Sequence, residues 1–111
     1  MSTFQFKNYD RTVTIAGIDF TLNCDASMGS VIRGLGVRLK ALSEEVNDGK
    51  KSNEEAVREL GGMIDTILGT GSTRKIFKGR RPTVSHCADV LLFLIKEFTA
   101  AQKELAPAFD K

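Results

Sequence analysis

The side chains that could do chemistry in this sequence are few and lie far apart. His86 is the only histidine, and the two cysteines, Cys24 and Cys87, lack the CxxC spacing of a zinc or redox site. Neighbours in sequence point away from each other on a helix, so a Cys–His nucleophile pair would need Cys24 to approach His86. A metal site needs three or four ligands, which only scattered carboxylates could complete here. We therefore expect no enzyme, no metal and no cofactor, with His86 on the surface or beside a helix cap.

A glycine-rich segment at 69–75, Gly-Thr-Gly-Ser-Thr-Arg-Lys, superficially suggests a phosphate-binding loop. It lacks the GxxxxGK[ST] order, and it follows a predicted helix instead of a strand. A helix N-terminus with Arg74 and Lys75 nearby could still hold an anion. The plainer interpretation is a connection between two helices, in which glycine tolerates positive φ and Ser72 caps the next turn.

The excess positive charge of the chain is confined to one short stretch. The net charge is −2 over residues 1–71, +5 over 72–81 and −1 over 82–111. The basic cluster consists of Arg74, Lys75, Lys78, Arg80 and Arg81. It could bind a phosphate backbone, dock onto an acidic protein surface or form a solvated loop. A protein is favoured over a nucleic acid, because the rest of the chain is slightly acidic and the one nearby aromatic residue, Phe77, fits the core better than a stacking role.

Hydrophobic periodicity predicts a mainly α protein with an N-terminal β-hairpin (α+β), in a single domain spanning residues 1–111. The hairpin is predicted at 12–23, where both halves alternate and Ala16-Gly17 forms a two-residue turn. That loop pairs Ile15 with Ile18 and Val13 with Phe20. An isolated hairpin is marginal in water, so we expect it to pack on a bundle of three longer helices and one short helix.

The helices are predicted from capping residues and apolar spacing. Their ranges are 26–47, 53–68, 73–78 for the short helix, and 83–105. Asp25 or Ser27 can cap the first helix, and Ser52 with Glu55 forms a capping box for the second.

Three glycines, Gly29, Gly34 and Gly36, lie inside the first predicted helix. Each costs about 1 kcal/mol relative to alanine. They are therefore either tolerated or used for the close approach of another backbone, and the sequence leaves both possibilities open.

The last predicted helix is apolar nearly all round at its middle, where Val90, Leu92, Phe93 and Ile95 widen the inward stripe. Such a helix is buried centrally or has one face covered by another subunit. Each apolar side chain left in water would forgo roughly 1.5–3 kcal/mol. We expect Leu92, Phe93 and Ile95 to contact a protein partner, and the charges of Arg80 and Arg81 to help it dock.

The N-terminus has no basic segment followed by an apolar run, so no signal peptide is predicted. The longest apolar run, at 90–95, is six residues long, whereas a bilayer span takes about 20. We therefore expect an intracellular protein with no membrane partner and with reduced, buried thiols.

Three segments together resemble a family of small phage and prophage proteins from Gram-positive bacteria. They are the hairpin at 15–20 (Ile-Ala-Gly-Ile-Asp-Phe), the step Asp25-Ala26 into a long helix, and 69–79 (Gly-Thr-Gly-Ser-Thr-Arg-Lys-Ile-Phe-Lys-Gly). A cysteine-containing helix, Cys87 to Phe98, follows as in that family. The resemblance runs from about residue 12 to 104, and it departs from the family at Arg80-Arg81-Pro82, where fewer positive charges are expected.

Members of this family resemble tail assembly chaperones, small helical proteins that coat the tape measure protein and hand over to tail-tube subunits. The resemblance implies a non-enzymatic protein of the host-cell cytoplasm that binds the tape measure protein or another tail protein, and also binds itself. It offers no catalytic residues to carry over. Two other hypotheses stay open: a nucleic-acid-binding phage regulator that uses the basic loop 72–81, and a structural tail-completion component.

Overall fold

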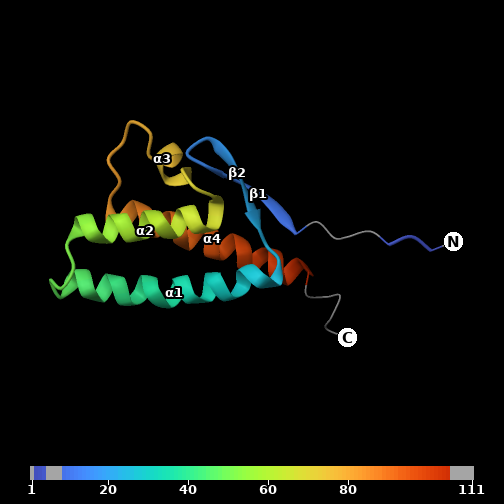
Figure 1. The fold of residues 1–111 in the computed structure, drawn as a ribbon, viewed down its shortest axis with the longest axis horizontal. Coiled ribbons are helices and arrows are strands. Elements are labelled where there is room, and N and C mark those ends of the chain that lie inside the picture. The colour runs from blue at the N-terminus through green and yellow to red at the C-terminus, as the bar shows by residue number, and fades with distance from the viewer. Residues whose placement is uncertain (1, 5–8, 106–111) are drawn as a thin grey trace.

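The computed structural model describes residues 2–4 and 9–105 and consists of a hairpin followed by four helices (Figure 1). The predicted fold class, mainly α with an N-terminal hairpin, is confirmed. The elements in chain order are β1 (Asp10–Ile15), β2 (Ile18–Asn23), α1 (Ala26–Asn47), α2 (Asn53–Leu68), α3 (Ser72–Ile76) and α4 (Val84–Leu105). The single-domain prediction also covered residues 1, 5–8 and 106–111, which lie outside the described residues.

The hairpin has the predicted register, with Ile15 opposite Ile18 and Val13 opposite Phe20. It begins at Asp10, two residues earlier than predicted, because Asp10 and Arg11 also pair with β2. The turn residues Ala16 and Gly17 have φ of 53° and 78°. Positive φ at both positions matches the twist of a two-residue hairpin, although it is uncommon for alanine.

The first two long helices begin and end as predicted, because their caps are made locally. The Asp25 side chain accepts a hydrogen bond from the Met28 backbone N–H at 3.2 Å. Ser52 and Glu55 exchange side-chain-to-backbone hydrogen bonds in a capping box. Each cap satisfies amide groups that a helix start would otherwise leave without a partner.

The short helix is shorter than the predicted 73–78, and its capping residue differs from the prediction. Ser72 does not cap α3; it is buried, and its hydroxyl donates to the Gly69 carbonyl oxygen at 2.7 Å. Asp65 of α2 takes the capping role, since its Oδ1 accepts from the Thr73 backbone N–H at 2.9 Å. A carboxylate eight residues back is a tertiary partner, which local sequence rules do not predict.

The last helix begins at Val84, one residue after the predicted start. The Thr83 hydroxyl oxygen accepts from the His86 backbone N–H at 3.1 Å, as an N-cap does. One side of α4 carries the buried residues Cys87, Leu91, Leu94, Phe98 and Ala101. This side packs mainly on α2.

In Figure 1, α1 and α2 run antiparallel, and α4 passes behind α2 toward the N-terminal end of α1. The hairpin and α3 lie on the other side of α2 from α1. Arg11 of β1 pairs with Glu97 and Glu104 of α4, which ties the hairpin to the last helix. The Gln102 side-chain amide donates to the Cys24 carbonyl oxygen, so the start of α1 is also held to α4.

Candidate protein-interaction surface

The residues with catalytic potential are not brought into a reactive arrangement. His86 is exposed in the first turn of α4, whereas both thiols are free and buried. Burial raises the pKa of Cys24 and of Cys87, so both thiols are protonated at neutral pH. Among the described residues, no group of three or more histidine, cysteine or carboxylate side chains could hold a metal ion.

The glycine-rich segment at 69–75 forms the connection between α2 and α3. Gly69 and Gly71 both have positive φ. The Asp65 carboxylate stabilises the turn by accepting hydrogen bonds from the backbone N–H groups of Gly71 and Thr73 and from the Thr73 hydroxyl. Burial alone would raise the pKa of Asp65, but these hydrogen bonds and the charge of Arg74 outweigh it and lower the pKa. The amide groups of this turn are therefore used by a carboxylate of the same chain, as a structural connection requires.

The five residues of the basic cluster are all exposed, on α3 and on the loop that leads into α4. Phe77, in the same stretch, is buried, so its ring is not available for base stacking. Arg81 lines a cavity of about 840 Å³ at the end of the bundle together with Arg58 and Glu54 of α2. Sequence analysis missed Arg58, because its position on α2 is far from the cluster along the chain and no local signal links the two.

The three apolar residues predicted for contact do not share one side of α4. Leu92 is 51% exposed and Phe93 is 36% exposed, whereas Ile95 is half-buried. Leu92 and Ile95 are three residues apart and lie on the same side of the helix. Phe93 and Ile95 are two residues apart and therefore point in nearly opposite directions.

Ile95 lines a groove of about 590 Å³ between α1 and α4, which we call the α1/α4 groove. It is lined by Ala26, Gly29, Ile32, Arg33 and Gly36 of α1 and by Ile95, Phe98, Thr99 and Gln102 of α4. Its floor is apolar, since Ile32 and Phe98 are buried. Leu92, one turn before Ile95, extends the apolar side of α4 beyond the groove.

The glycines of α1 are not needed for packing among the described residues. A Cβ atom at Gly34 or Gly36 would meet no atom within 4 Å. At Gly29 it would lie 3.8 Å from the Phe98 ring, an ordinary contact, and 3.4 Å from the Arg33 guanidinium. Gly34 and Gly36 thus both border open space, and at Gly36 that space is part of the α1/α4 groove.

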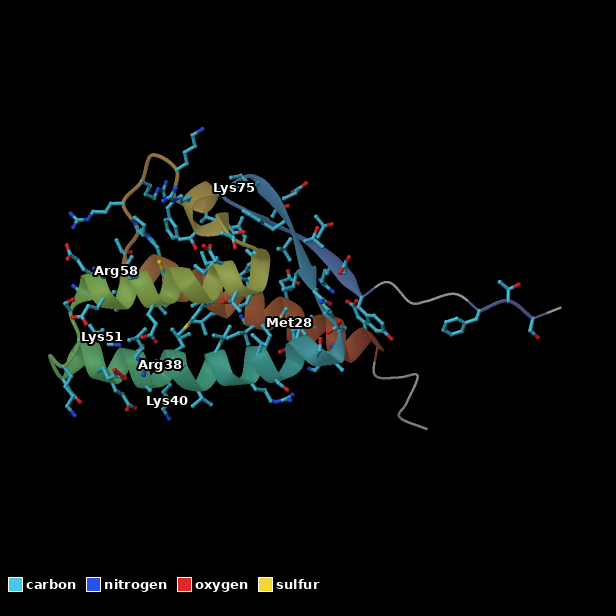
Figure 2. The ribbon with its side chains drawn as sticks, in the orientation of Figure 1. Met28, Arg38, Lys40, Lys51, Arg58 and Lys75 are labelled. Carbon is cyan, nitrogen blue, oxygen red and sulfur yellow. The ribbon has the colours of Figure 1, made fainter. Side chains whose placement is uncertain are left out.

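The opposite side of α1 is closed by charged groups. The Arg38 guanidinium donates to Glu59 of α2 and to Glu45 of α1, and the Lys51 ammonium donates to Glu59 at 3.0 Å. Hydrogen bonds from Arg38, and then from Lys51, lower the pKa of Glu59 to about 2. Arg38 and Lys51 lie in the half of the helix pair nearest its connecting loop (Figure 2).

No model of a known protein family matches the chain, and no curated protein or solved structure matches it either. No helix within 9–105 combines the length and hydropathy that a membrane span needs.

Proposed function

We propose that this protein is a non-enzymatic binding protein of the tail assembly chaperone kind, and that its α1/α4 groove receives a hydrophobic helix of a tail protein such as the tape measure protein. The open groove beside a firmly attached α1 is the observation that carries this proposal. Ile32, Ile95 and Phe98 provide an apolar floor. Because Arg38 holds the other side of α1 to α2, a client can fill the groove without displacing α1.

Glycine at position 36 supports a helical client in particular. Helices approach each other most closely where a side chain is absent, and Gly36 has no neighbouring atom that would explain its use within this chain. Leaving glycine inside a helix costs about 1 kcal/mol relative to alanine. Close approach of a client backbone to Gly36 would explain why glycine, and not alanine, occupies this position.

Self-association belongs to the same proposal. Leu92 and Val37 are exposed, at 51% and 74%, on two helices that border the groove. Single exposed apolar residues are common on protein surfaces. Beside an apolar groove, however, they extend a surface that a second copy could cover when no client is bound.

The test is co-expression with a phage tape measure protein, followed by measurement of soluble client and of co-purification. We expect the wild-type protein to keep the client soluble and to co-purify with it. Gly36→Leu should fill the groove and reduce the amount of bound client about tenfold or more, because a buried leucine occupies the space of the client side chains.

Gly34→Leu is the matched control. It makes the same chemical change two residues away, at an exposed position outside the groove lining, and gains the same helix propensity. Client binding should be retained. Equal loss in both variants, or no client solubilisation by the wild type, would contradict the proposal.

A further inference from the structure

A further pocket lies between the hairpin turn, α3 and the first half of α4, and it shares no lining residue with the α1/α4 groove. We call it the hairpin pocket; its volume is about 610 Å³. Its apolar lining is Ile15, Ala16, Ile18, Ile76, Phe77 and Val90. Ile15, Ile18 and Val90 are only half-buried, so the chain itself leaves part of this apolar wall uncovered.

One wall of the hairpin pocket is fixed in shape by the β-turn. Ala16 lines the pocket and has φ of 53°, a left-handed conformation that is unfavourable for residues other than glycine. The pairing of Ile15 with Ile18 on either side of the turn holds Ala16 in this conformation. A partner would therefore meet a preformed wall and would not need to order it.

The rim of the hairpin pocket is cationic. Lys75, Lys78 and Arg80 line it, against one carboxylate, Asp89. All three cations are exposed, and none of them forms an ion pair with another residue of 2–4 or 9–105. They contrast with Arg38, which is paired with two carboxylates.

We propose that the hairpin pocket docks a short acidic segment of a partner protein that carries one or two apolar side chains. The apolar side chains would cover Ile15, Ile18 and Val90, and the acidic groups would pair with Lys75, Lys78 and Arg80. A partner of this chemistry is complementary to both the apolar wall and the cationic rim of the pocket. A nucleic acid would match the rim alone, because Phe77 is buried and leaves no ring for stacking.

The hairpin pocket carries three cations on its rim, whereas Arg33 is the one cation among the described residues that line the α1/α4 groove. The occupant therefore differs from the hydrophobic helical client proposed for the α1/α4 groove. The two sites share no lining residue, so they can be tested separately.

The experiment is titration of the full chain with a fluorescent synthetic peptide of alternating glutamate and leucine, followed by fluorescence anisotropy. Backbone amide NMR of the same sample locates the site. We expect saturable binding with shifts at Ile18 and Val90. The triple variant Lys75→Glu/Lys78→Glu/Arg80→Glu should bind about tenfold more weakly, since three exposed charge pairs are lost.

Lys40→Glu is the control for the single variant Lys75→Glu, which makes the same change of charge and should weaken binding. Lys40 is an exposed lysine on α1, on the far side of the molecule from Lys75 (Figure 2). The Lys40→Glu variant should bind the peptide as the wild type does. A polyglutamate peptide without leucine should bind more weakly than the alternating peptide, because it leaves the apolar wall uncovered.

Three results would overturn the proposal: no saturable binding to the wild type, equal weakening by Lys40→Glu, or tighter binding of duplex DNA than of the peptide. The triple variant should still solubilise the tape measure protein, whereas Gly36→Leu should still bind the peptide. Failure of one proposal can thus be told apart from failure of the other.

Discussion

Along α1, the side that faces α2 is closed by ion pairs, whereas the side that faces α4 opens into a groove of about 590 Å³. Arg38, Glu45, Glu59 and Lys51 form a network on the closed side. On the open side, Gly29 and Gly36 replace the side chains that would fill the space between the helices.

One helix can therefore be held in place along one side while its other side stays open. Contacts on one flank hold α1 in position, so the other flank does not need tight packing to keep the fold. A groove formed in this way is present before any partner arrives, which reduces the ordering cost of binding.

The largest expected effect concerns the core beneath α1. Leu42 is 1% exposed, and Leu42→Ala should lower the free energy of unfolding by about 2–5 kcal/mol, because it removes buried methyl groups and leaves a cavity. The half-buried groove residue Ile95, changed to alanine, should cost less, about 1 kcal/mol. Urea denaturation measures both. Equal losses of stability would mean that the groove is as tightly packed as the core, which would contradict an open side of α1.

The next effect is a pH dependence that belongs to the closed side. The pKa of Glu59 is lowered to about 2, from an ordinary value of 4.5, so its contribution is fully present above pH 4.5 and is lost as the pH falls toward 2. Because the side chain is partly exposed, solvent screening limits the contribution to about 1 kcal/mol. Urea denaturation at several pH values between 5 and 2 should show this decline in the wild type.

Arg38→Met should remove most of that decline, since Arg38 is the main cause of the low pKa of Glu59. Arg33→Met is the control, because Arg33 is an exposed arginine on the groove side of the same helix. An unchanged pH profile in Arg38→Met would show that Lys51 is sufficient to lower the pKa of Glu59.

Alanine at the glycines of α1 should stabilise the fold. Gly34→Ala and Gly36→Ala should each raise the free energy of unfolding by about 0.5–1 kcal/mol, because alanine is the better helix former and neither Cβ meets an atom within 4 Å. Gly29→Ala should gain less, since its Cβ would lie 3.4 Å from the Arg33 guanidinium. Thermal or urea denaturation provides the measurement. A loss of stability at Gly36 would show that the groove is narrower than described.

Much of the fold could be predicted because its signals are local. The hairpin register follows from alternation around Ala16-Gly17, and the starts of α1 and α2 follow from Asp25 and from the Ser52–Glu55 box. The start of α3 could not be predicted, because its cap is Asp65 from another helix.

The surfaces were harder to predict than the elements. The apolar run at 90–95 indicated an excess of hydrophobic surface, but only the three-dimensional structure shows that Leu92 and Phe93 are exposed whereas Ile95 lines the α1/α4 groove. The sequence also left the role of the glycines open, since a gap beside Gly36 depends on where α4 crosses α1. Arg58 joined the basic residues through tertiary structure alone.

The smallest effect on stability is expected at Leu92 and Phe93, the exposed apolar residues of α4, which also test self-association. Leu92→Ser and Phe93→Ser should each change the free energy of unfolding by about 0.5 kcal/mol or less, because both side chains are exposed. Sedimentation velocity over a range of protein concentrations should nevertheless separate them. Leu92→Ser should weaken self-association, since Leu92 lies on the groove side, whereas Phe93→Ser should leave it unchanged. The reverse result would place the contact between copies on the side of α4 that carries Phe93. The α1/α4 groove would then bind the client but not a second copy.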